Sequence, residues 1–100
     1  FIECHYYIFF FFFEWCRNNI GKDLNYCEYI NHNLGNDAWQ DIILMKNCKH
    51  NIIANSSFSW WGAWLNENID KIVISPHNWF ANAKYEILAS ELIPEDWVRL

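Results

Sequence analysis

The side chains best suited to chemistry lie together at Asn55, Ser56, Ser57, Phe58 and Ser59, where three hydroxyls and one amide follow an apolar segment. A tryptophan-rich stretch comes directly after them, so the group stands between an expected strand and an expected helix. The start of a helix offers unpaired N–H groups and the positive end of the helix dipole. A diphosphate binds well to such donors without a lysine. The junction therefore predicts a phosphate-binding site for a small ligand.

Two other interpretations of this junction involve no ligand. Ser56 or Ser57 can simply cap the following helix. The run Asn55-Ser56-Ser57 also matches the acceptor pattern for N-glycosylation. A sequon between a buried strand and a buried helix is rarely accessible, so glycosylation is not expected here.

The elements that must position this junction follow a regular rhythm. Strands are expected at residues 6–12, 26–31, 51–55 and 71–75, and helices at residues 14–20, 37–49, 57–66 and 83–89. Strands that recur every 20 to 25 residues or so are typical of short strand–helix units. Because the strands are nearly continuous in apolar residues, we predict an α/β fold with a Rossmann-like parallel sheet that is covered on both faces. Ligands in such sheets bind beyond the carboxyl ends of the strands.

Local signals refine the expected helices. Gly21 is a plausible stop for the first helix, and Asn36 or Asp37 can cap the second. The third helix carries apolar side chains nearly all round, which predicts that it is buried. Its tryptophans either stack on a sugar or base, or belong to the core, and core packing is the usual role at this spacing. These tryptophans are Trp60, Trp61 and Trp64.

Composition excludes several classes of function. The net charge of −5, with only seven Lys and Arg, argues against nucleic-acid binding. The four cysteines have no C-x-x-C or zinc-finger spacing, so we expect free thiols in preference to a metal site or a disulfide framework. The apolar run at residues 6–13 is far shorter than the about 20 residues of a membrane-spanning helix, and a buried strand explains it.

The histidines are scattered. They show no i, i+4 pairing of the kind that marks a metal site, so no metal is expected. His50 precedes an expected strand, and a structural hydrogen bond is its expected role. His77 follows the fourth expected strand, from which it could approach a ligand.

Three motifs carry a family resemblance: CKHNIIANSSFSWWGAWLN at residues 48–66, KIVISPHNWF at residues 71–80 and LIPEDWVRL at residues 92–100. Together with most of the chain from about Tyr7 onward, they resemble glycosyltransferase family 11, and its bacterial branch most closely. That family contains α-1,2-fucosyltransferases. The middle motif is long and includes an unusual tryptophan pair, so a chance match is not expected.

The resemblance implies an activity and an architecture. Family members transfer L-fucose from GDP-fucose to a galactose hydroxyl of a glycan acceptor, with inversion and without a required metal or other cofactor. The expected architecture is GT-B-like, with two Rossmann-like halves and the donor bound by the C-terminal half. Residues 1–100 would then form one partial nucleotide-sugar-binding domain, with the N-terminal acceptor half absent. A bacterial protein would be cytoplasmic or peripherally membrane-associated, and a eukaryotic one would reside in the Golgi.

The resemblance also assigns site residues. Asn55, Ser56, Ser57, Phe58 and Ser59 correspond to the donor-binding motif, and the three serines are the candidates for diphosphate contacts. A second candidate region, for the guanine and ribose, is formed by His32, Asp37 and Asp41. A carboxylate such as Asp41 could accept hydrogen bonds from guanine. The alternative is that both aspartates are capping or solvated helix charges.

Two departures from the family pattern bear on activity. The His-x-Arg-Arg-x-Asp motif is missing from the chain, and Phe10-Phe11-Phe12 stands where many relatives have Ser-Asp-Asp. No histidine or carboxylate is identified as a catalytic base. We therefore expect the isolated chain to be inactive. A truncated or degenerate non-catalytic nucleotide-binding domain is the alternative function, and a domain for another sugar nucleotide is a third.

Overall fold

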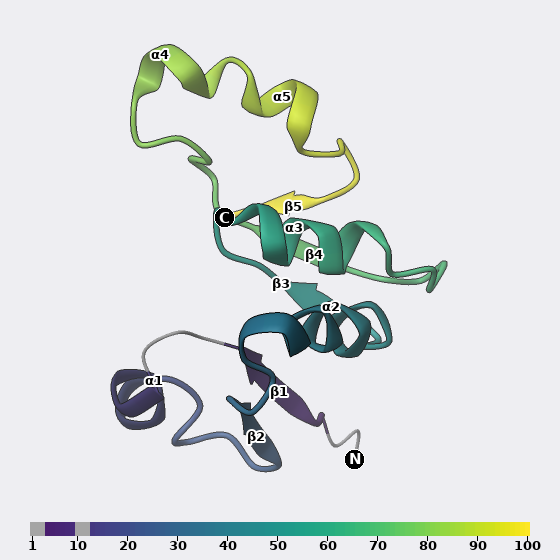
Figure 1. Ribbon diagram of the computed structural model, residues 1–100. Helices are drawn as coiled ribbons and strands as arrows, with labels where there is room; N and C mark the ends of the chain where they lie inside the picture. The colour runs from purple at the N-terminus through teal and green to yellow at the C-terminus, as the bar shows by residue number, and fades with distance from the viewer. Residues whose placement is uncertain (1–3, 10–12) are drawn as a thin grey trace. The chain divides into compact units, whose positions relative to one another are not determined.

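The computed structural model describes residues 4–9 and 13–100, which fall into two compact units, Phe1–Asp41 and Ile42–Leu100. Each unit is an α/β arrangement of short parallel strands and short helices (Figure 1). The strands form two separate sheets, one of two strands and one of three. The prediction of an α/β fold with parallel strands is thus confirmed. The four expected strands, however, are not assigned to one continuous sheet.

The first unit is built from one strand–helix–strand segment. Strand β1 (Tyr6–Phe9) pairs in parallel with strand β2 (Cys27–Ile30), and helix α1 (Phe13–Asn19) lies between them in the chain. The prediction that the first strand is buried is wrong, because its first two residues are exposed and the next two are only partly buried. The aromatic residues at positions 10–12, where many relatives have Ser-Asp-Asp, lie outside the described residues.

Gly21 ends the first helix as predicted. Its φ is 77°, in the left-handed region that favours glycine. Space is a second constraint, because a Cβ on Gly21 would lie 2.7 Å from Cys27 Sγ and 2.8 Å from Ile8 Cδ1. The turn therefore needs glycine both for its backbone conformation and for its close approach to the two strands.

The second predicted helix is shorter than expected. A 3₁₀ turn, η1 (Gly35–Asp37), comes first, and helix α2 (Trp39–Lys46) follows it. Asn36 and Asp37 consequently lie inside the turn and do not cap α2, so that prediction is wrong.

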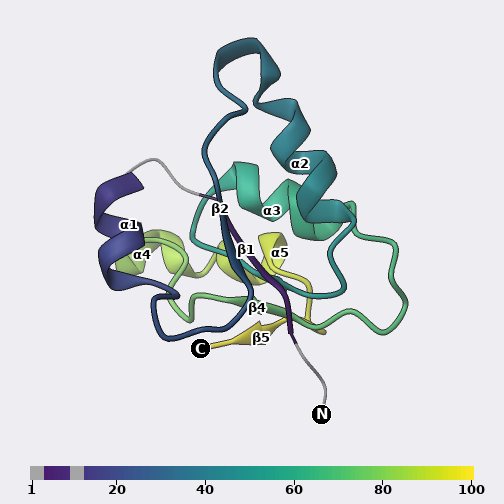
Figure 2. The ribbon, with the colours of Figure 1, turned by 90° about the horizontal axis from the view of Figure 1, so that it is seen from below.

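The second unit contains the three-stranded sheet, with strand order β3-β4-β5 and every pair parallel. Its strands are β3 (Asn51–Ile52), β4 (Val73–Ser75) and β5 (Val98–Arg99). Helix α3 (Ser57–Trp64) connects β3 to β4, and the crossover from β4 to β5 carries α4 (Ala83–Glu86) and α5 (Ala89–Leu92), as can be followed in Figure 2. Strand β5 and helix α5 were not predicted from the sequence.

One face of this sheet carries the core of the unit. Val73 of β4 is 2% exposed and clusters with six other buried side chains from α3, α5 and the connecting segments: Ile53, Ala63, Trp79, Ala89, Ile93 and Trp97. Along the same strands the exposure alternates, and Ile52 is 77% exposed. The prediction of a sheet covered on both faces is therefore wrong for the described residues of this unit. Ile52 of β3 is exposed, although its neighbour Ile53 belongs to the core.

Helix α3 is buried on one side only. Gly62 and Ala63 are buried and Trp60 packs against the core, whereas Trp61 and Trp64 are 49% and 51% exposed. The prediction of burial all round is wrong because a helix needs only one apolar stripe to pack on a sheet. Trp60 is the core tryptophan among the three.

Gly62 sets how closely α3 approaches Met45 of α2. A Cβ on Gly62 would lie 2.7 Å from both Met45 Cβ and Met45 Sδ. Alanine is favoured over glycine in a helix by about 1 kcal/mol, but overpacking costs about 1–3 kcal/mol. We expect Gly62→Ala to lower the free energy of unfolding in urea denaturation. A second substitution, Met45→Ala, removes the Sδ contact but keeps the Cβ contact, so it should relieve only part of that added penalty. An increase in stability from Gly62→Ala alone would contradict the close approach.

Candidate functional site

The carboxyl ends of β3, β4 and β5 meet at one edge of the sheet, because the strands are parallel and in register. Ile52 pairs with Ile74, Ile74 pairs with Val98 and Ser75 pairs with Arg99. Backbone hydrogen bonds continue past the strand ends, from Ile53 N to Ile74 O at 2.8 Å and from Leu100 N to Ser75 O at 2.9 Å. The segments that follow the three strands therefore start side by side.

Helix α3 begins at this edge, directly after the segment that follows β3. Ser56 is its N-cap residue, with an extended backbone (φ −129°, ψ 132°), and its side chain makes no capping hydrogen bond to the described residues. The interpretation that the Ser56 hydroxyl caps the helix is therefore wrong, and Ser57 is the first helical residue. The N–H groups of the first turn have no intrahelical partner. These N–H groups are therefore available to a ligand that binds at this edge of the sheet.

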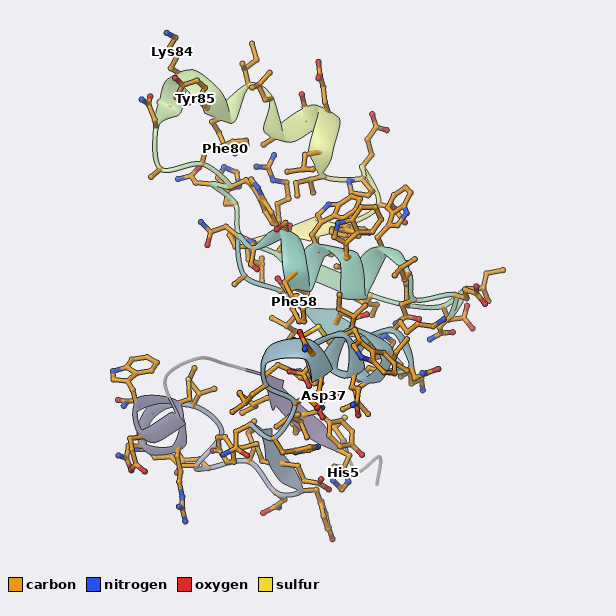
Figure 3. The ribbon with its side chains drawn as sticks, viewed as in Figure 1. His5, Asp37, Phe58, Phe80, Lys84 and Tyr85 are labelled. Atoms are coloured by element: carbon orange, nitrogen blue, oxygen red, sulfur yellow. The ribbon has the colours of Figure 1, made fainter. Side chains whose placement is uncertain are left out.

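Asn55 and Ser59 hold the junction in shape. Asn55 Nδ2 donates to the Trp79 carbonyl at 3.3 Å, which ties the segment after β3 to the segment after β4. Ser59 Oγ lies 3.2 Å from the Ala54 carbonyl and 3.1 Å from the Ser56 carbonyl, and donates to this pair of acceptors. Both side chains thus have structural partners. Ser57 is exposed, while Ser56 and Phe58 are partly buried (Phe58 is labelled in Figure 3).

The other candidate residues belong to the first unit and are described within it. His32 and Asp37 are exposed, and Asp37 Oδ1 accepts from Gln40 Nε2 at 3.3 Å. Asp41 is partly buried, and its Oδ1 accepts from Asn33 Nδ2 at 2.7 Å. The Asp41 carboxylate therefore ties the segment after β2 to the start of α2. One of its oxygens already has this internal role.

Sequence reasoning missed a charged pair near the sheet edge. Glu86 of α4 and Arg99 of β5 form an ion pair, with 2.5 Å between Glu86 Oε1 and Arg99 Nη2. Glu86 Oε2 also accepts from Phe80 N at 2.8 Å. The hydrogen bond from the Phe80 N–H, together with Arg99, holds the pKa of the Glu86 carboxyl below its ordinary value. In the sequence the two residues are 13 positions apart, with no periodic signal that joins them.

Two histidines, His50 and His77, make hydrogen bonds next to the strands. His50 Nδ1 accepts from Ile72 N at 3.0 Å, so its predicted structural hydrogen bond is confirmed. His77 N donates to Leu100 O at 2.5 Å, and its carbonyl accepts from Arg99 Nη2. His77 therefore contributes its backbone to this edge of the sheet. All four cysteines are free.

Within residues 4–9 and 13–100, no three His, Cys, Asp or Glu side chains are grouped so that they could hold a metal ion. No helix there has both the length and the apolar character that crossing a membrane requires.

Comparison with known proteins places these features in a family. Residues 6–100 match the family described as glycosyl transferase family 11. The O-antigen biosynthesis glycosyltransferase WbnK of Escherichia coli is 42% identical over 94 residues, covering 87% of this chain and 27% of that protein. An alpha-1,2-colitosyltransferase of Escherichia coli is 40% identical over 87 residues, covering 87% of this chain and 29% of that protein.

The chain thus spans less than a third of the length of these relatives. No solved structure matches it. The family match covers the helices and strands of both units. It therefore includes the junction at Asn55 to Ser59 and strand β5, which carries Arg99. This chain belongs to glycosyltransferase family 11.

Proposed function

We propose that this chain is the donor-binding part of a GT-B-like α-1,2-glycosyltransferase. It would bind GDP-fucose and present the sugar to a galactose-containing glycan acceptor. The observation that carries the proposal is the start of α3, where Ser56 adopts the N-cap conformation but its side chain leaves the first-turn N–H groups without a cap. Membership of glycosyltransferase family 11 supports a nucleotide-sugar donor.

The junction can serve the leaving diphosphate in two ways. The first-turn N–H groups and the helix dipole favour negative charge at the helix start. The Ser57 hydroxyl is exposed beside them. Because Asn55 and Ser59 are held by backbone carbonyls, these donors are already oriented before ligand arrives. Preorganised donors that meet developing charge stabilise a transition state efficiently.

Transfer with inversion also needs a base beside the acceptor hydroxyl. We assign this role to no described side chain, and we propose that another part of the enzyme supplies the base and the acceptor site. His32, Asp37 and Asp41 remain our candidates for the guanine and ribose contacts. Colitose is a second candidate donor sugar, because one relative is an alpha-1,2-colitosyltransferase. The O-antigen relative favours a bacterial, cytoplasmic or peripherally membrane-associated setting.

The second candidate function is a non-catalytic nucleotide-binding domain. The residues Phe10-Phe11-Phe12, which stand where many relatives have Ser-Asp-Asp, favour it. Both functions predict GDP binding, and they differ in turnover. Fucosyl transfer by a longer protein that contains this chain would favour the enzyme.

Ser57→Pro tests the donor site without breaking the helix. Proline is tolerated at the first helical position, and the extended Ser56 (ψ 132°) is the conformation that proline favours in its predecessor. The substitution removes one N–H donor. We expect GDP binding, followed by NMR titration, to weaken at least about tenfold, as for the loss of one hydrogen bond to a charged group.

Ser57→Ala is the matched control, because it removes the hydroxyl and keeps the N–H group. Equal GDP affinity for Ser57→Pro and the unsubstituted chain would reject the helix start as the diphosphate site. Nucleotide choice gives an independent check by thermal shift. GDP should raise the melting temperature more than UDP or ADP at equal concentration, and a larger shift with UDP or ADP would favour a domain for another sugar nucleotide.

A further inference from the structure

The Glu86–Arg99 pair holds the segment that follows β4. Glu86 uses both carboxylate oxygens, one for Arg99 Nη2 at 2.5 Å and the other for the Phe80 N–H at 2.8 Å. Arg99 Nη2 also donates to the His77 carbonyl. Two backbone groups of the segment at residues 77–80 are therefore bound by one ion pair. Figure 3 shows Phe80 in this segment, ahead of Lys84 and Tyr85 of α4.

The same segment contacts the proposed donor site. Between the two bound backbone groups lies Trp79, whose carbonyl accepts from Asn55 Nδ2 at 3.3 Å. Asn55 immediately precedes the N-cap residue of α3. The Trp79 side chain is 7% exposed and packs in the core. A continuous path of contacts thus runs from Glu86 and Arg99, through the backbone around Trp79, to Asn55.

The geometry points to Glu86 and Arg99 as positioning residues of the donor site: their ion pair sets the segment at residues 77–80, which in turn orients Asn55 and the start of α3. This inference rests on the proposed function, since it concerns the same site. Neither residue needs to touch the nucleotide. They act by holding Asn55 and the start of α3 in the conformation that binds the ligand.

Three features suit the pair to this role. Arg99 belongs to β5, in register with Ser75 of β4, so the ion pair anchors the segment to the sheet itself. The side chains are 30% and 24% exposed, so water screens the pair less than it screens an ion pair on the open surface. Arg99 Nε is buried with no hydrogen-bond partner among the described residues, so its Nη2 contacts determine where the guanidinium sits.

The test uses variants at the two positions of the ion pair. Glu86→Gln and Arg99→Gln each break the ion pair, and Arg99→Lys keeps the positive charge but loses the planar fork. Glu91→Gln is the matched control, because Glu91 is an exposed carboxylate of α5 that forms no ion pair within residues 4–9 and 13–100. GDP affinity is measured by NMR titration, and the Phe80 amide is followed by hydrogen exchange in the same samples.

We expect Glu86→Gln and Arg99→Gln to raise the dissociation constant for GDP about tenfold and to speed exchange of the Phe80 amide. Arg99→Lys should restore part of the affinity, with a loss of about threefold. Glu91→Gln should change neither quantity. Thermal melts check that each variant is folded at the titration temperature.

Two results would overturn the inference while leaving the donor site intact. One is faster Phe80 exchange with unchanged GDP affinity, which would make the pair a purely structural contact. The other is unchanged Phe80 exchange, which would mean that the pair does not hold the segment. If the unsubstituted chain binds no GDP, the proposed function itself fails and the inference falls with it.

Discussion

Replacing Asn66 with leucine is expected to lower the free energy of unfolding by about 2–4 kcal/mol, because it leaves several polar groups without partners. Asn66 is 4% exposed. Its Nδ2 donates to Cys48 O at 2.7 Å and to Asn51 Oδ1 at 2.8 Å. Its Oδ1 accepts from Asn68 N at 2.9 Å. Urea denaturation of the variant and the unsubstituted chain measures the difference.

Asn47→Leu is the matched control for this prediction. Asn47 is exposed and makes one side-chain hydrogen bond, to Ile43 O at 2.8 Å. Its loss should cost about 1 kcal/mol or less. Equal costs for the two variants would show that the buried amide network contributes little. The comparison matters for function because Asn66 lies just beyond α3, whose other end forms the proposed donor site.

Trp97→Ala is expected to cost about 3–5 kcal/mol, the usual range for deleting a buried large aromatic side chain. Trp97 is 5% exposed and belongs to the core of the second unit. Its ring also lies 5.9 Å from that of Trp60, centroid to centroid. The variant should therefore unfold at a much lower urea concentration and lose near-ultraviolet circular dichroism from the packed tryptophans.

Trp61→Ala tests whether the loss in the free energy of unfolding depends on the burial of the tryptophan or only on its residue type. Trp61 is 49% exposed and meets Trp60 edge-on, with the centroids 5.0 Å apart and the planes at 89°. Because solvent already reaches half of this side chain, we expect a loss of about 1 kcal/mol. A cost as large as that of Trp97→Ala would mean that the exposed face of α3 is packed in solution.

Local sequence signals predicted the parts of the fold that depend on neighbouring residues. The turn at Gly21 was predicted because a left-handed backbone conformation favours glycine wherever it occurs. The strand–helix junction at Ser56 and Ser57 was predicted because the change from an apolar strand to a helical run occurs within a few residues. The motif at residues 48–66 also indicated glycosyltransferase family 11, which the match over residues 6–100 confirms.

Other elements escaped prediction because their stability comes from distant partners. Strand β5 has two residues, too few for a periodic pattern, and it exists because Val98 and Arg99 pair with β4. Helix α3 was expected to be buried all round, but its sequence cannot show which tryptophan meets the core. Trp60 does so, and its Nε1 donates to the Leu92 carbonyl at 3.0 Å, a partner 32 residues away.

The α/β class, the family and the position of the Asn55 to Ser59 junction could all be predicted from the sequence, because each depends on a continuous stretch of residues. How these side chains are used depends on contacts between segments that lie far apart in the chain. Ser56 does not cap α3, Asn55 reaches Trp79, and Glu86 meets Arg99. The physical reason is that strand pairing brings the segments after β3, β4 and β5 to one edge, and hydrogen bonds between them depend on that arrangement.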